Sequence, residues 1–138
     1  MPSGNDCIPE IRVLGPTGME DYYAHLLRLD RTHALPAIAD DAIGPHCLRL
    51  LSNGAILVGA YVDGVMRAAA EIVPDRTARA ADAAITVEQG FDDRGFAGML
   101  TERIINEARR YHMSMLRVLE QSSIRNIRVA DRQSYANG

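Results

Sequence analysis

The dipeptide Asp63-Gly64 lies between two apolar, β-forming runs and restricts the fold more than any other feature. Residues 55–62 (AILVGAYV) precede it and residues 65–73 (VMRAAAEIV) follow it. Asp-Gly tolerates the positive φ of a tight reversal, so the two runs predict a β-hairpin. Residues 81–87 (ADAAITV) predict a further strand. The middle of the chain is therefore expected to form an antiparallel meander.

The flanking segments predict four helices and two more strands. A capping box of Thr17 and Glu20 is expected to start the first helix, and Ser122 or Ser123 to cap the last, with Ile124, Ile127 and Ala130 facing inward. The predicted order is a strand over 11–14, helices over 17–29 and 40–51, the meander, a helix over 95–111, a strand over 113–119 and the last helix. This predicts an α+β fold with a mixed, mostly antiparallel sheet, one β-α-β crossover and helices on both faces.

Composition narrows the class of protein. The chain has 138 residues, 47% hydrophobic and 24% charged, which fits one globular domain over 1–138. No apolar run reaches the roughly 18 residues of a membrane span, and MPSGND is not a signal peptide, so we expect a soluble, cytoplasmic protein. Cys7 and Cys47 predict no disulfide framework, and the four scattered histidines no metal site.

Charge is unevenly distributed. All 15 basic residues are arginines. Residues 94–138 carry eight arginines against four acids, a formal +4, whereas residues 1–93 carry seven against fourteen, a formal −7. A net charge of −3 does not favour nucleic-acid binding, although a basic C-terminal third is able to hold a small polyanion.

The segment Arg94-Gly95-Phe96-Ala97-Gly98-Met99 separates a predicted strand from a predicted helix. The first N–H groups of a helix have no intrahelical partners and lie at its positive end, and small residues let a ligand approach them. This predicts a phosphate site. The alternative is that the glycines serve only a tight turn and close helix–sheet packing. The segment is neither a G-x-G-x-x-G fingerprint nor a P-loop.

Residues 83–100 (AAITVEQGFDDRGFAGML) resemble the acyl-CoA-binding motif of the GNAT N-acetyltransferases. Val87 and Phe91 match its strand-end turn, and Gly95 and Ala97 match its glycine positions, whereas Asp92 replaces the usual Gln or Arg. The order of elements over about 10–132 is similar too, and HLLRLD, VDGVMRAAAE and ITVE resemble a bacterial subgroup. The resemblance implies transfer of an acetyl group from acetyl-CoA to an amine, which attacks the bound thioester directly.

The resemblance also implies roles for individual residues. Pantetheine would pair with the strand edge at Ile85, Thr86 and Val87, and the Val87 amide would polarise the thioester carbonyl. The pyrophosphate would lie on the amides of Arg94, Gly95, Phe96, Ala97, Gly98 and Met99, close to Asp92, with Gln121 in place of a family Asn. The candidate general bases are Glu88 first, then Glu71 and Glu120, with Asp82 weaker; each is alternatively a solvated or structurally paired acid.

Three expectations stay open on the sequence. The acceptor is a small-molecule or protein amine that no motif identifies. Arg128 stands where many family members have a catalytic Tyr, and the residues after the predicted last helix are expected to be too few for the family's two usual C-terminal strands. A catalytically degenerate CoA-binding or regulatory module is therefore the alternative, ahead of an unrelated α+β interaction domain. The edge of strand 113–119 would need covering by the tail or by a second subunit, which predicts a homodimer.

Overall fold

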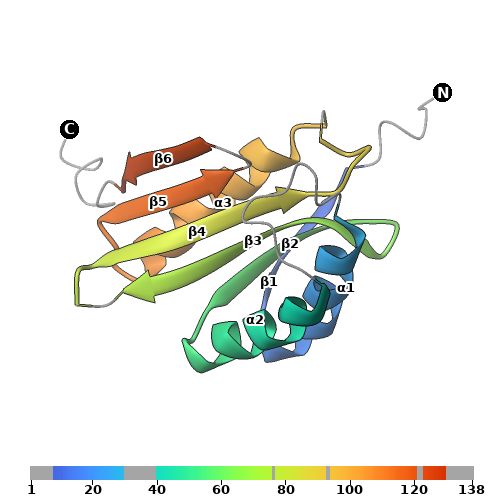
Figure 1. The fold of residues 1–138 in the computed structure, drawn as a ribbon. Helices are drawn as coiled ribbons and strands as arrows, with labels where there is room; N and C mark the ends of the chain where they lie inside the picture. Colours follow the sequence, from blue (N-terminus) through green and yellow to red (C-terminus); the bar gives the residue numbers. More distant parts are fainter. Residues whose placement is uncertain (1–7, 30–39, 76, 93, 121–122, 130–138) are drawn as a thin grey trace.

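The computed structural model describes residues 8–29, 40–75, 77–92, 94–120 and 123–129 (Figure 1). No helix in these ranges is long and apolar enough to cross a membrane. Along the chain they form β1 (Glu10–Leu14), the 3₁₀ turn η2 (Pro16–Gly18), α1 (Met19–Arg28), α2 (Asp40–Ser52), β2 (Ile56–Val62), β3 (Val65–Asp75), β4 (Ala80–Val87), α3 (Phe96–Arg110), β5 (Met115–Glu120) and β6 (Ser123–Arg128).

The strands of the described residues form one sheet in the order β1-β2-β3-β4-β5-β6. Only β4 and β5 are parallel, since α3 connects them as a crossover, and the other neighbours are antiparallel. The predicted hairpin is confirmed: Asp63 has φ 52° and Gly64 φ 80°, the left-handed pair that a tight two-residue reversal requires. The predicted α+β fold with a mixed, mostly antiparallel sheet is confirmed as well.

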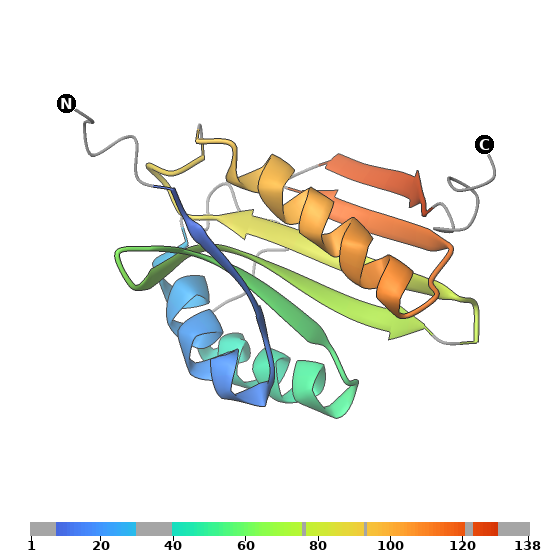
Figure 2. The same cartoon turned by 180° about the vertical axis from the view of Figure 1, so that it is seen from behind.

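Two apolar cores lie on opposite faces of the sheet. Helices α1 and α2 lie together on one face beside β2 and β3, and α3 crosses the other face (Figures 1 and 2). Successive side chains of a strand point to opposite faces. On β3, Ala70 and Ile72 therefore belong to the α3 core, whereas Ala69 belongs to the α1–α2 core. Glu71 consequently points toward α1 and α2, where it meets Tyr22 and His46.

The predicted last helix is wrong. Residues 123–128 form β6, which is antiparallel to β5 with Leu119 opposite Ile124 and Leu116 opposite Ile127. The spacing of the two isoleucines fits a helix, but the free edge of β5 offers a full row of backbone partners. Ile124 is 61% exposed rather than inward, and only Ile127 contacts the core; Ala130 lies outside the described residues. The tail thus covers the edge of β5, while the homodimer stays a prediction.

The predicted capping box is also wrong. Thr17 lies inside η2, and α1 begins after Gly18, where no side chain caps the helix. Pro16 favours the start of this 3₁₀ turn, in which the Gly18 amide donates to the Gly15 carbonyl at 3.0 Å. A backbone hydrogen bond is therefore found at the start of this helical segment, in place of the side-chain hydrogen bonds expected from Thr17 and Glu20.

The hairpin turn gives the first testable prediction. Gly64→Ala places a Cβ on a residue with φ 80°, so it should lower the free energy of unfolding by about 1–2 kcal/mol. Gly98→Ala is the control, because Gly98 lies in α3 where alanine is favoured. Urea denaturation of both variants measures this, and an unchanged midpoint for Gly64→Ala would contradict the turn.

Candidate functional site

The N-terminus of α3 opens beside the end of β4. Gly95 is the N-cap with φ 79°, a left-handed conformation that suits glycine. Among the described residues no side chain caps this helix, and its first turn contains no acidic residue. The Phe96 ring is buried in the core at 2% exposure, so it anchors the helix while its backbone stays at the entrance. No described side chain therefore accepts a hydrogen bond from the first amides of α3. These amides are available to donate hydrogen bonds to an anion.

Gly98 helps to decide whether this segment is a phosphate site or serves only a tight turn and close helix–sheet packing. A Cβ built on Gly98 would meet no atom within 4 Å, and Gly98 has no positive φ. Close helix–sheet packing therefore does not explain it. Gly95 has the same open space, although its φ already accounts for a glycine. The fold has room for a side chain at position 98, but the sequence has a glycine there. An open surface of this kind suits the approach of a ligand.

The described pairing of β4 with β5 stops before the end of β4. β4 pairs with β5 from Ala80 opposite Met115 to Ile85 opposite Glu120, the last described residue of β5. Thr86 and Val87 continue beyond this last described pair and are in register with Ala69 and Ala68 of β3. Within the described residues, they form the end of β4 that leads toward α3. The predicted Gln121 contact lies outside the described residues.

Glu88, the first candidate base, is buried in a network of donors. It is 4% exposed and lies directly after β4. His25 Nδ1 donates to its Oε2 at 2.9 Å, Arg67 Nη1 to its Oε1 at 2.9 Å, and Arg28 Nε to both oxygens at 3.1 Å. Burial alone raises the pKa of Glu88, but the hydrogen bonds from His25 and Arg67 and the charge of Arg28 outweigh it and lower that pKa. Glu88 is therefore an ion-paired carboxylate and a weak base.

His25 connects this network to β4. It is fully buried on α1, and burial lowers the pKa of its imidazole, an effect that the hydrogen bond to Glu88 only partly offsets. A neutral imidazole has one donor nitrogen, and a carboxylate only accepts, so Nδ1 carries the proton. Nε2 then accepts from the Thr86 hydroxyl at 2.8 Å. Thr86 is thus fixed by α1 through its side chain.

Arginine side chains surround the loop between β4 and α3. The guanidinium of Arg94 lies 4.7 Å from the centre of the Phe91 ring, and that of Arg67 lies 5.1 Å from it. The centroid of the Phe91 ring in turn lies 6.2 Å from the centroid of the Phe96 ring. Arg94 and Asp92 are both exposed at this entrance, whereas Ala97 and Met99 pack partly against the core. The entrance is therefore polar, and two guanidinium groups lie over the Phe91 ring.

Glu71, the second candidate, belongs to a separate cluster on the α1–α2 face. It accepts hydrogen bonds from the Tyr22 hydroxyl and from His46 Nε2, the latter at 2.9 Å. Burial raises the pKa of Tyr22 well above its usual value, and the neighbouring Glu71 adds to this, so the hydroxyl stays protonated. Tyr22 and His25 lie one turn apart on α1 with ring centroids 6.0 Å apart. The two clusters thus meet along α1.

The remaining candidates lie elsewhere. Glu120 is in register with Ile85, which places it on the α3 face, opposite to Glu71 and Glu88. There Arg125 of β6 donates to Glu120 at 3.4 Å and to Thr101 at 3.4 Å. Asp82 is exposed and ion-paired to Arg117 at 3.1 Å. The structure therefore places Glu71 and Glu88 in two clusters on one face of the sheet and Glu120 on the other face.

Sequence reasoning missed Tyr22, His25 and His46. Tyr22 and His25 are separated by three positions in an apolar helix pattern, which marks them only as candidates for its inner face. His46 has no neighbour in the sequence that suggests a carboxylate partner. The contacts of Glu71 join positions 49 and 25 residues apart, so only the folded chain brings them together.

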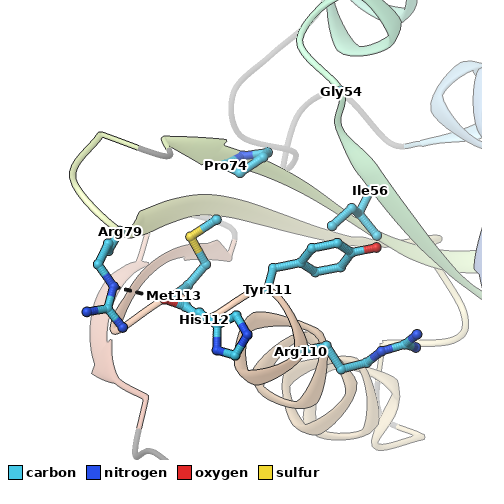
Figure 3. Close-up of a pocket in the computed structure, with 8 residues that line it drawn as sticks. All are labelled: Gly54, Ile56, Pro74, Arg79, Arg110, Tyr111, His112 and Met113. Carbon is cyan, nitrogen blue, oxygen red and sulfur yellow. Dashed lines mark hydrogen bonds between the residues drawn. The ribbon is translucent and has the colours of Figure 1, made fainter.

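A pocket of about 500 Å³ opens at the opposite end of α3 (Figure 3). It is lined by Gly54, Ile56, Pro74, Arg79, Arg110, Tyr111, His112 and Met113. The 15 residues of α3 place it about 22 Å from Gly95 at a rise of 1.5 Å per residue. This pocket is therefore not part of the entrance beside β4.

The Glu88 network predicts a large cost for neutralising the carboxylate. Glu88→Gln leaves Arg28 and Arg67 without a counter-charge at a buried site, so the free energy of unfolding should fall by about 2–4 kcal/mol. Asp82→Asn removes the exposed pair with Arg117 and should leave stability nearly unchanged. Urea denaturation compares the two, and equal losses would show that Glu88 is not the structural centre of the site.

The same network predicts that the free energy of unfolding decreases in acid. The folded protein resists protonation of His25, whereas an unfolded histidine binds its proton near pH 6.5. Because the unfolded state then binds more protons, stability falls as pH decreases below about 6.5, by up to about 1.4 kcal/mol per pH unit. The lowered pKa of Glu88 adds a second loss as pH falls below the ordinary value of 4.5.

His25→Gln tests this pH dependence, since an amide keeps one donor for Glu88 and one acceptor for Thr86. Its unfolding free energy, measured between pH 7 and 5, should have a smaller slope than that of the wild type. A steeper slope would mean that His25 is stabilised as an imidazolium, contrary to the direction given above.

Solved structures share this architecture, although no protein-family model and no curated protein matches the sequence. The GNAT family N-acetyltransferase YhbS from Escherichia coli, in complex with CoA, superposes with a TM-score of 0.66 and 17% identity, over 86% of this chain and 64% of that one. Ribosomal-protein-alanine N-acetyltransferase from Brucella melitensis biovar Abortus 2308 gives 0.61 and 22%, over 83% and 82%.

A third structure, the PaiA N-acetyltransferase from Thermoplasma acidophilum in complex with coenzyme A, gives a TM-score of 0.61 and 12% identity, over 80% of this chain and 77% of that one. The three structures superpose with TM-scores of 0.61 to 0.66 although the identities are only 12–22%, so the likeness is one of fold. The chain therefore has the fold of the GNAT acetyltransferases.

Proposed function

We propose that this protein is an acyl-CoA-dependent N-acetyltransferase, in which an amine attacks the thioester of bound acetyl-CoA directly. One observation carries the proposal: the uncapped start of α3, kept open at Gly98, lies beside the end of β4 in a GNAT fold. Three solved structures of that fold, two N-acetyltransferases and a phosphinothricin acetyltransferase, are described as complexes with CoA or acetyl-CoA.

The residues at the entrance fit a diphosphate. The amides from Gly95 to Gly98 supply donors at the positive end of a 15-residue helix, and Arg94 adds a cation. Asp92 is exposed, so solvent screens its charge. Thr86 and Val87 lie beyond the last described pair with β5; their backbone groups are proposed to bond to the pantetheine amides, and the Val87 amide to polarise the thioester carbonyl.

The acceptor is proposed to be a small-molecule or protein amine that approaches from the α1–α2 face. Both carboxylate clusters lie on this face, among the side chains of α1, α2 and β3. A carboxylate-rich face suits a cationic amine. Cytoplasmic location and homodimer formation stay predictions of the sequence.

Gly98→Gln tests the binding site without disturbing the fold. Glutamine is a good helix former, and its Cβ meets no atom within 4 Å, so the melting temperature of the free protein should not fall. Acetyl-CoA at 100 times its Kd should stabilise the wild type by about 2.7 kcal/mol. The variant should lose most of this stabilisation, because the side chain fills the space above the helix amides.

Asn106→Gln is the matched control, an exposed position two turns further along α3. It should keep the full stabilisation by acetyl-CoA. Equal stabilisation of the wild type and Gly98→Gln would place the cofactor elsewhere, and no stabilisation of the wild type would contradict the proposed function. Stabilisation without thiol release against any amine would support the binding-module alternative.

A further inference from the structure

The cluster of Tyr22, His46 and Glu71 joins α1, α2 and β3 on the face that the acceptor is proposed to use. Tyr22 and His46 Nε2 both bond to the same oxygen of Glu71, Oε2. A carboxylate that accepts from Nε2–H fixes the tautomer of the imidazole and leaves the Nδ1 lone pair able to take a proton. Within the described part of the chain, Nδ1 of His46 has no hydrogen-bond partner.

We infer that His46 is the general base that deprotonates the acceptor amine and that Glu71 is the residue that positions it; this inference rests on the proposed function. An imidazole held by a carboxylate on one nitrogen and free on the other is a well-established general-base arrangement. His46 is half-buried, with 18% of its side chain exposed, so both an amine and water have access to it.

The contacts of each carboxylate leave it less accessible to the amine than His46. One oxygen of Glu71 accepts two hydrogen bonds, one of them from a tyrosine whose raised pKa keeps its proton in place. Glu88 is ion-paired to two arginines and buried. Glu120 lies on the other face of the sheet. The titratable groups around the imidazole are Glu71 on β3, Tyr22 on α1 and Cys47 on α2.

Register places this cluster on the same face as the end of β4. Glu71 is directly opposite Ala84, which precedes Val87 by three residues, or about 10 Å along the strand. The thioester is proposed to lie at Val87, beyond the last described pair with β5. An amine that reaches across β3 from α2 therefore approaches β4 about 10 Å before this point.

The chemical step balances without a further reactant. The ammonium of the acceptor gives one proton to Nδ1 of His46, which passes it to water. The free amine attacks the thioester carbonyl carbon, so a C–N bond forms and the C–S bond breaks. The attached nitrogen loses its second proton, and the leaving thiolate takes one up. The sum is R–NH3⁺ plus acetyl-CoA giving the N-acetyl amide, CoA–SH and H⁺.

A matched pair of variants, His46→Asn and His112→Asn, tests the assignment. His112 is an exposed histidine at the far end of α3 with φ 60°, which asparagine tolerates. Thiol release from acetyl-CoA is followed with spermidine, an aminoglycoside and a lysine-containing peptide. In His46→Asn, kcat should fall about 100-fold or more with the KM for acetyl-CoA unchanged, whereas His112→Asn should behave as the wild type.

Two further readouts separate a base from a structural residue. Added imidazole should restore part of the turnover of His46→Ala, which a packing role does not explain. In Glu71→Gln, the ¹⁵N NMR spectrum of His46 should change from one tautomer to a mixture, with acetyl-CoA binding retained. Melting curves of each variant check that it is folded.

The outcomes distinguish this inference from the proposed function. Wild-type turnover in His46→Asn would overturn the assignment of the base. Binding of acetyl-CoA without thiol release from any amine in the panel would contradict the proposed function in favour of the binding module, and the inference that rests on it would fail with it. Failure of the wild type to bind acetyl-CoA would also contradict the proposed function.

Discussion

The buried carboxylate of Glu88 fixes the geometry on which the site depends. A charge removed from water costs several kcal/mol unless donors replace its hydration, and the donors here come from α1 and from β3. The Glu88 amide in turn donates to the Arg67 carbonyl at 2.8 Å. The end of β4 is thus held to two other elements, and α3 starts eight residues later from a position that this contact sets.

Partner chemistry gives the two carboxylates of the α1–α2 face different roles. Glu88 is surrounded by guanidinium groups that stay charged at any working pH, so it is anchored. Glu71 instead accepts hydrogen bonds from a hydroxyl and an imidazole. One helix, α1, supplies a ring to each cluster, and the centroids of those rings lie 6.0 Å apart. The anchored carboxylate and the proposed base are therefore adjacent but separate.

Local signals predict much of this fold because they act within a few residues. The φ requirement at Asp63-Gly64 fixes the hairpin, and the apolar repeat of α3 fixes the crossover. β6 is not predictable in this way, since the 124/127 spacing fits a helix and only the free edge of β5 selects a strand. For the site, the glycines at the α3 entrance are readable from the sequence. The His46–Glu71 contact is not, because it depends on how α2 packs over β3.

Because β6 replaces the predicted last helix, α3 is the helix whose N-terminus is proposed to bind the cofactor. The described residues place no helix after β5, so no second helix N-terminus faces the proposed cofactor from that side. Each charge near a helix N-terminus gains about 0.3–1 kcal/mol from the dipole, and hydrogen bonds to charged groups contribute about 1.5–3 kcal/mol each. The affinity of the proposed site therefore depends on how many α3 amides reach the ligand, and the open space at Gly98 leaves room for that approach.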